Sequence, residues 1–407
     1  MNERNSPPAN APFGDRLRHY RDRLGMTRPV LGGLVGRSPD WVKDVEGGRL
    51  QQPRLPMLQR LAHVLNVGLD DLVGGPVPIA SYTKGAHGSL SSVTDALTDY
   101  PIDTGDITPL TSAELAGRAS AAWQLWHGSA RQRTAVAVVL PDLIRQGRLA
   151  ARLHDGRERR AAHRELARIY HLVQLYLAFQ PVPEMVLLAG DRAMTAAQDS
   201  DDPHAIAVAA WYMNHIFRNS GERDAARIDL SQRAMKLLDP ERGGEDLARW
   251  GLLQLACALS HAKSGREGDA LRHWDEAHRA ARGLGRAYAH PWLVFGTSMV
   301  DAYAVTIQAD LTHGGTASRL ADRLDLDALP SATRRSFHLT ESARAYLMRR
   351  EPVAAVALLR QAETASPETL KFSPWARSAI LELSETGTPA TRRDAAALRS
   401  SLGLEAA

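Results

Sequence analysis

A short segment with the sequence GRSPDWVKDVEGG, residues 36–48, combines helix-capping residues with charged side chains that could contact a partner. Ser38 is suited to act as the N-cap, Pro39 fits the first helical position, and Asp40 adds negative charge to the first turn. A pair of glycines ends the segment, which predicts a helix of barely two turns. Basic residues that could neutralise an anion flank it: Arg37, Lys43, Arg49 and Arg54.

Residue types that support catalysis or metal binding occur without the spacing that such chemistry needs. The fifteen histidines form no HExxH motif, and a single cysteine, Cys257, cannot supply a pair of thiolate ligands. Paired acids at 70–71 and 201–202 stand at predicted turns or helix starts, where N-capping explains them. No glycine-rich phosphate loop and no GxSxG elbow occur. We therefore expect no metal, no cofactor and no enzymatic activity, and we expect Cys257 to be a packing residue.

The composition predicts a globular protein of two or three domains, because 407 residues that are 44% hydrophobic can bury a sizeable core. No apolar run approaches the roughly 18–20 residues of a membrane span. Residues 1–12 lack an apolar segment and predict a disordered lead rather than a signal peptide. Together with the single cysteine, these features favour a cytoplasmic protein without a membrane partner.

The net charge of +4 is mild, and 45 of the 50 basic residues are arginine. Because a GC-rich genome favours arginine codons, the placement of the basic residues is more informative than their number. Residues 13–74 hold ten basic and seven acidic residues, a net charge of +3, so most of the net charge lies in this region.

Three regions of the chain differ in composition and in the spacing of apolar residues, and together they predict an all-α protein. Residues 13–74 carry dense apolar periodicity that glycine or proline interrupts every dozen residues. Residues 75–111 are rich in Gly, Pro, Ser and Thr, which indicates a linker with one short helical turn near 93–97. Residues 112–407 show helical spacing throughout, in segments of about 15–20 residues joined by short turns.

The third region repeats the spacing of the roughly 34-residue tetratricopeptide pattern in two places. One copy comprises Gln254, Cys257, Ala258, His261, Ala270, Trp274 and Ala277. The other comprises Leu339, Ser342, Ala343, Tyr346, Ala355, Leu359, Ala362 and Pro367. Helix pairs at 114–148, 160–198 and 203–238 keep the length without the signature residues, and a looser, longer pair spans 291–329. The region resembles a degenerate tetratricopeptide solenoid, which winds stacked helix pairs into a superhelix with a concave face.

The first region predicts five short helices, over residues 13–25, 28–36, 38–46, 55–67 and 69–74. Thr27 is suited to cap the second helix. Apolar spacing predicts which side chains face inward: Phe13, Leu17, Tyr20, Leu24, Leu31, Val35, Val42, Val45, Leu58, Leu61, Ala62 and Leu65. The second and third helices, joined by a glycine-containing turn, have the lengths of a helix-turn-helix.

This order of apolar residues, with Gly32 and the turn at Gly36, strongly resembles the Cro/repressor-like (XRE) DNA-binding family. The resemblance covers about 60 residues and implies a five-helix, lambda-repressor-like domain. With the tetratricopeptide-like region behind it, the chain is similar to transcriptional regulators of an actinobacterial type. The family pairs an arginine of its first helix with a glutamate near the end of the recognition helix, and Arg21 and Glu46 occupy those positions.

The resemblance also implies which residues contact double-stranded DNA. Pro39, Asp40 and Asp44 take positions that usually read bases in the major groove, while Thr27, Arg28 and Ser38 take positions near phosphates. Two aspartates would repel phosphate unless they accept hydrogen bonds from cytosine N4. Trp41 either stacks on the nucleic acid or packs against a neighbouring helix. The remaining candidates are the basic Arg37, Lys43 and Arg49.

Two functions from different classes remain open. The first is a sequence-specific transcriptional regulator that binds a pseudo-palindrome as a homodimer and senses a peptide or protein effector in its concave groove. The second is a scaffold or adaptor whose helix-turn-helix binds protein instead of DNA, which the two aspartates favour. Candidate groove residues are Trp211, Asn214, Arg218, Trp250 and Trp292.

Overall fold

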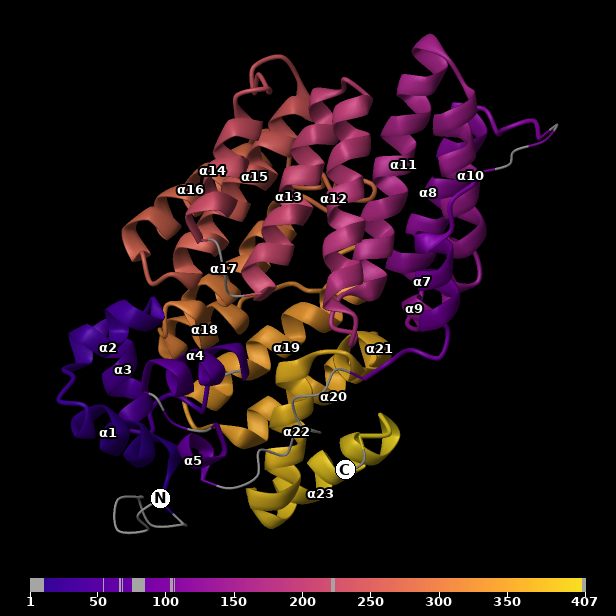
Figure 1. The fold of residues 1–407 in the computed structure, drawn as a ribbon. Helices are drawn as coiled ribbons and strands as arrows, with labels where there is room; N and C mark the ends of the chain where they lie inside the picture. The colour runs from indigo at the N-terminus through magenta and orange to yellow at the C-terminus, as the bar shows by residue number, and fades with distance from the viewer. Residues whose placement is uncertain are drawn as a thin grey trace.

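The computed structural model describes residues 11–53, 55–65, 67, 69–74, 85–102, 105, 107–220 and 224–404. Every regular element in these ranges is a helix, so the predicted all-α class is confirmed (Figure 1). None of the helices found there combines the length and the apolar character that crossing a membrane requires.

The N-terminal domain consists of the five predicted helices. They are α1 (Phe13–Arg23), α2 (Arg28–Val35), α3 (Pro39–Glu46), α4 (Leu55–Leu65) and α5 (Leu69–Val73). Their shared core includes Leu17, Leu31, Val42 and Leu61, all with no exposed surface. Leu24, predicted to face inward, is instead 41% exposed. The reason is that α1 ends at Arg23, so Leu24 lies beyond the last turn and off the apolar face.

The segment predicted as a linker contains a longer helix than expected, and this helix packs against the core of the C-terminal domain. Residues Leu90–Thr98 form α7, longer than the single expected turn, and its Val93, Ala96 and Leu97 are fully buried. These three side chains share one apolar cluster with the helices that follow. Part of the predicted linker is thus a structural element of the second domain. The predicted linker residues 75–84 lie outside the described residues, as does Arg54.

The C-terminal domain stacks antiparallel helix pairs in chain order. It begins with α8 (Ser112–Gly128), α9 (Gln132–Ala137) and α10 (Leu140–Leu153). The pairs are α11 (Gly156–Leu177) with α12 (Pro183–Asp199), α13 (Pro203–Ser220) with α14 (Asp224–Met235), α15 (Gly244–Lys263) with α16 (Glu267–Gly283), α17 (Thr297–Asp310) with α18 (Gly314–Ala321), and α19 (Ala332–Met348) with α20 (Pro352–Ala365). After the short α21 (Pro367–Lys371), the last pair is α22 (Pro374–Thr386) with α23 (Pro389–Ser401). This is solenoid-like packing.

Small residues sit between the helices of the two pairs that carry the repeat spacing. Ala258 and Ala270 between α15 and α16, and Ala343 and Ala355 between α19 and α20, are fully buried. A methyl side chain at these points lets two helix backbones approach closely. Cys257 is buried in the same layer, where burial raises the pKa of its thiol to about 12, so the thiol stays protonated.

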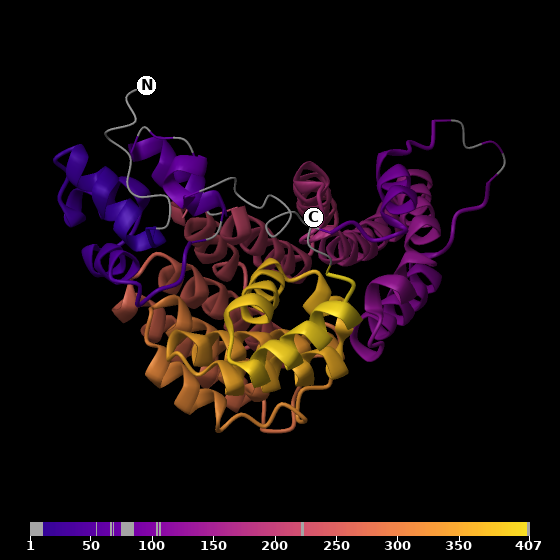
Figure 2. The same cartoon turned by 90° about the horizontal axis from the view of Figure 1, so that it is seen from below.

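The helix pairs curve until α19 contacts α8 at the beginning of the domain (Figure 2). His127 at the end of α8 donates from Nε2 to the Trp292 carbonyl at 2.9 Å, and its Nδ1 lies 2.9 Å from the Ser331 hydroxyl at the start of α19. Farther along, the backbone N–H of Arg133 donates to Glu368 Oε2 of α21 at 2.6 Å. Contacts between residues more than 200 positions apart therefore close the domain.

Candidate nucleic-acid interface

The turn between α2 and α3 is built so that the two helices cross closely. Gly36 adopts a left-handed conformation with φ of 68°, which ends α2 and lets the Arg37 N–H donate to the Gly32 carbonyl at 2.7 Å. A Cβ atom at Gly32 would lie 2.6 Å from the Arg37 carbonyl oxygen, so only glycine fits under the turn. The hydroxyl of Thr27 accepts from the Val30 N–H, and that of Ser38 accepts from the Trp41 N–H at 3.1 Å. Both predicted N-caps are confirmed.

A buried ion cluster anchors α3 to the other two helices. Arg21 of α1 donates from Nε to Glu46 Oε1 at 2.5 Å and from Nη2 to Oε2 at 3.1 Å, and the side chain of Glu46 is 1% exposed. These hydrogen bonds to Glu46 raise the pKa of Arg21 above its ordinary value. The predicted pair is therefore in place. It fixes the C-terminal end of α3 and leaves the N-terminal end to project.

Arg28 belongs to the same cluster, which sequence reasoning did not anticipate. Its Nε donates to Glu46 Oε2 at 2.7 Å, and its side chain is only 38% exposed. The expectation was that Arg28 lies near phosphate. A carboxylate has about four lone-pair sites, so the buried Glu46 can accept hydrogen bonds from two guanidinium groups. Arg28 is therefore the third member of the ion cluster that Arg21 and Glu46 form.

The outer face of α3 is open to solvent even with the C-terminal domain present. Val42 and Val45 face the core, while Trp41 is half-buried against the apolar cluster with the Arg37 guanidinium 5.7 Å from its ring centroid. Trp41 thus packs within the domain. The exposed side chains on or next to this helix are Ser38, Pro39, Asp40, Lys43 and Arg49.

The two aspartates of this face differ in their surroundings. Asp44 lies 2.6 Å from Arg49 Nη2 and is 26% exposed, so its charge is compensated within the domain. Asp40 is exposed in the first turn of α3. The exposed face of α3 consequently combines a helix N-terminus, the carboxylate of Asp40 and the ammonium group of Lys43, a set that can both accept and donate hydrogen bonds.

Among the described residues, hydrogen bonds on either side of α3 join the helix-turn-helix to the C-terminal domain. Arg37, which precedes the N-cap residue of α3, donates to the Lys263 carbonyl at the end of α15. Arg350, the second residue after α19, donates from Nη2 to the Gly48 carbonyl at 3.3 Å. The position of α3 therefore depends on the helical domain as well as on its own core.

A family model described as a helix-turn-helix domain matches residues 12–73, which run from the residue before α1 to the end of α5. The search of curated proteins finds no match for the chain. The match, the short turn at Gly36 and the projecting α3 define the N-terminal domain as a helix-turn-helix domain of the DNA-binding class.

The candidate groove residues of the C-terminal domain are not brought together on an open surface. Asn214 is fully buried and donates to the Arg227 carbonyl and to the hydroxyls of Ser231 and Ser260, so it ties α13 to α14 and α15. Trp211 is 1% exposed in the main core. Both expectations were wrong, because these side chains point between stacked pairs. Two others are half-buried, Arg218 beside His215 and Trp250 against the main cluster.

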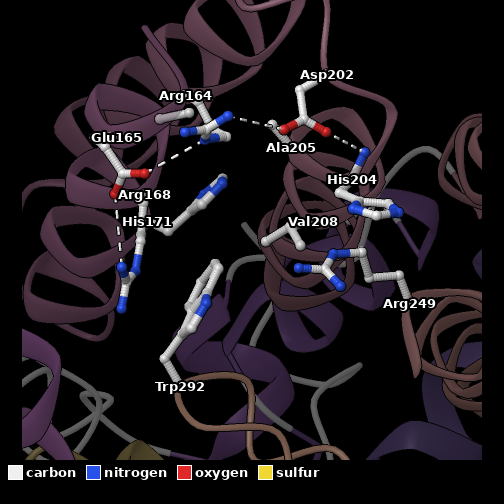
Figure 3. Close-up of a pocket in the computed structure, with 11 residues that line it drawn as sticks. Arg164, Glu165, Arg168, His171, Asp202, His204, Ala205, Val208, Arg249 and Trp292 are labelled. Carbon is white, nitrogen blue, oxygen red and sulfur yellow. Dashed lines mark hydrogen bonds and ion pairs between the residues drawn. The ribbon is translucent and has the colours of Figure 1, made fainter. Parts of the chain in front are cut away.

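Trp292 is the exception, because it lines a cavity of about 300 Å³ (Figure 3). The cavity lies between α11, α13 and α15, and Trp292 enters it from the segment before α17. The other polar lining residues are Arg164, Glu165, Arg168, His171, Asp202, His204 and Arg249. Sequence reasoning missed them, although Arg164, Arg168 and His171 follow a helical spacing of four and three residues that puts them on one face of α11.

The cavity is not arranged as a metal centre. Within the described part of the chain, no group of three or more His, Cys, Asp or Glu side chains is placed to hold a metal ion. Burial lowers the pKa of His171 to about 3, so its imidazole is neutral at physiological pH. The neutral ring stacks on Tyr212, with 4.6 Å between the centroids. The cavity therefore offers aromatic surface, guanidinium groups and a neutral imidazole.

Proposed function

We propose that the chain is a sequence-specific transcriptional regulator in which α3 enters the major groove of double-stranded DNA. The observation that carries this proposal is the exposed outer face of α3 on a domain that matches a helix-turn-helix family. A two-turn helix suffices, since only its N-terminal half must reach base edges. Asp40 is proposed to contact a base, with Ser38, Lys43 and Arg49 near the flanking phosphates.

The regulator is proposed to act as a homodimer on a pseudo-palindromic site. One five-helix domain contacts too few base pairs to select a site in a genome, whereas two symmetric copies double the contacted sequence. The C-terminal helical domain would provide the dimer contact and bind a peptide or protein effector. The contacts of Arg37 with Lys263 and of Arg350 with Gly48 support communication between the domains, because a shift of α15 or α19 would move α3.

The proposal is tested by measuring how the full chain binds the promoter region of its own gene and random DNA of equal length at several salt concentrations. We expect tighter binding to the promoter and a linear fall of log affinity with log salt. Replacing Lys43 or Arg49 by alanine should weaken binding and reduce the slope by about 0.9 for each phosphate that the variant no longer neutralises. The matched control is Arg18→Ala, since Arg18 is an exposed arginine of α1 in the same domain.

Equal affinity for promoter and random DNA would refute sequence-specific regulation. If the Lys43 and Arg49 variants bind DNA as the unaltered chain does, α3 is not the DNA-contacting element. An adaptor that binds protein through this domain would then account better for the exposed Asp40.

A further inference from the structure

The cavity at Trp292 carries more positive than negative charge among its lining residues. Glu165 and Asp202 are its two carboxylates, and Arg164 lies 3.4 Å from the first and 3.7 Å from the second. Arg164 is thus within ion-pair distance of both acids, and Arg168 also pairs with Glu165. Two further guanidinium groups, those of Arg168 and Arg249, line the same space.

The two remaining arginines occupy different places around the Trp292 ring. Arg168 lies over the ring with its guanidinium carbon 5.1 Å from the centroid, and it also donates to the Ser120 hydroxyl at 3.1 Å. Arg249 lies on α15 and donates from Nη1 to Glu245, whose side chain is 60% exposed. Figure 3 shows the guanidinium of Arg249 and the ring of His171 pointing into the cavity above Trp292.

Several buried polar atoms of the lining find no hydrogen-bond partner among the described residues. They include Nε of Arg168, Nε of Arg249 and Nδ1 of His171, whose side chain is 1% exposed. Glu165 Oε2 also lacks a hydrogen bond, but it lies 3.6 Å from Arg168 Nη1, within ion-pair distance. Because a guanidinium Nε–H can only donate, the unpaired set is richer in donors than in acceptors. An unsatisfied buried donor is unfavourable, and an anionic ligand would satisfy it.

The rest of the wall is apolar. Ala167, Ala205 and Val208 face the cavity together with the indole of Trp292. The volume of about 300 Å³ falls at the small end of the range for ligand pockets. A matching ligand therefore has one anionic group and one flat or branched apolar group of modest size.

We propose that this cavity binds an organic carboxylate that carries an apolar or aromatic group. Arg249 binds the carboxylate, the imidazole of His171 adds a second hydrogen bond, and Trp292 stacks on the apolar group with Arg168 behind it. The inference rests on the proposed function, in which the C-terminal helices sense an effector. The carboxylate is supplied either by a small free acid or by the C-terminus of a peptide.

The test uses two matched pairs of probes on the full chain, with binding measured by isothermal titration calorimetry. One pair is phenylpropionate and its neutral analogue phenylpropionamide. The other is a tripeptide ending in phenylalanine, with a free or an amidated C-terminus. We expect each carboxylate to bind at least about tenfold more tightly than its amide, because the amide cannot form the charge-assisted hydrogen bonds. The pair that binds more tightly identifies the source of the carboxylate.

The variants assign the binding to this cavity. Arg249→Gln should weaken carboxylate binding by about tenfold or more, and Arg249→Lys should retain part of it because the charge remains. Arg272→Gln changes an exposed arginine of α16 and should leave binding unchanged. A thermal unfolding curve for each variant checks that it is folded.

Equal binding of acids and amides, unaltered binding by Arg249→Gln, or no binding of any probe at millimolar concentration would each overturn the inference. DNA binding, measured separately, distinguishes the two proposals. A chain that selects its promoter yet binds no probe contradicts only the carboxylate site. A chain that binds the acids yet does not select a promoter contradicts the proposed function.

Discussion

At the scale of single residues, a few buried polar side chains decide how helices are held relative to one another. Glu46 accepts from arginines of both α1 and α2, and Asn214 donates to groups on α14 and α15. His127 links α8 to the segment before α17 and to α19. Because an unpaired buried polar group is costly, each of these side chains stabilises only one arrangement of its helices.

His127 makes the stability of the chain depend on pH. Burial lowers its pKa from the ordinary 6.5 to about 4 in the folded chain. The unfolded chain therefore takes up the proton first, so the stability is fully present above pH 6.5 and is lost as the pH falls toward 4. From this residue alone we expect the free energy of unfolding to decrease by about 2 kcal/mol between pH 7 and about pH 5.

Urea denaturation of the full chain and of His127→Gln at the two pH values measures this contribution. Glutamine can still donate to the Trp292 carbonyl but takes up no proton, so the variant should lose about 2 kcal/mol less than the unaltered chain. His313→Gln, at a side chain that is 41% exposed, serves as the control. Identical pH dependence of His127→Gln and the unaltered chain would contradict the assignment.

At the scale of elements, the lengths of α2 and α3 and the turn between them place the exposed face of α3. Thr27 and Ser38 begin the helices, and Gly36 ends the first of them in a left-handed conformation. The Arg21–Glu46 cluster then fixes the far end of α3. The two N-caps, the turn at Gly36 and the Arg21–Glu46 pair all lie within a segment of fewer than 30 residues. The local sequence is therefore enough to define this element.

Two neighbouring glycines of α2 test the importance of close helix approach. In Gly32→Ala, the new Cβ would meet the Arg37 carbonyl oxygen at 2.6 Å, and backbone cannot move aside as a flexible side chain would. We expect a loss of about 1–3 kcal/mol in the free energy of unfolding of the domain, together with weaker DNA binding. Chemical denaturation and titration with promoter DNA measure the two effects.

Gly33→Ala is the matched control, because a Cβ at Gly33 meets nothing within 4 Å. Alanine favours the helix over glycine by about 1 kcal/mol, so this variant should be as stable as the unaltered chain or more stable. Equal effects of the two substitutions would show that helix propensity, and not close approach, governs this turn.

At the scale of the whole molecule, the closed solenoid and the docked helix-turn-helix make one connected body. Glu368 of α21 accepts from the backbone N–H groups of Arg133 and Thr134, at 2.6 and 3.2 Å, and its side chain is 12% exposed. Burial lowers the pKa of the adjacent Arg133 to about 10. This contact closes the domain over more than 230 intervening residues.

Removing this carboxylate should loosen the closure. For Glu368→Ala we expect a loss of about 1–3 kcal/mol in the free energy of unfolding, because the N–H groups of residues 133 and 134 lose their acceptor. Urea denaturation measures the loss, and small-angle X-ray scattering should record a larger radius of gyration. Glu385→Ala, at an exposed site on α22, should change neither value, and a Glu368 variant with the same behaviour as this control would contradict the closure.

The sequence alone determined the features that depend on neighbours a few positions apart. The five helices of the first domain, the caps at Thr27 and Ser38, and the alanines between paired helices follow from spacing of three and four residues. The pairing of Arg21 with Glu46 was also predicted, but from the resemblance to a known family. Leu24 was misplaced because the last turn of a helix is poorly defined by local pattern.

Only the tertiary structure decided which side chains meet across distant pairs. Trp211 and Asn214 are buried in it, and Arg28 pairs with Glu46. His127 contacts Ser331, and Arg249 lines the same cavity as Trp292. The physical reason is that the small crossing angles between successive helix pairs add up along a solenoid and set its curvature. Contacts 200 residues apart therefore depend on all the packing between them, which spacing within one helix does not encode.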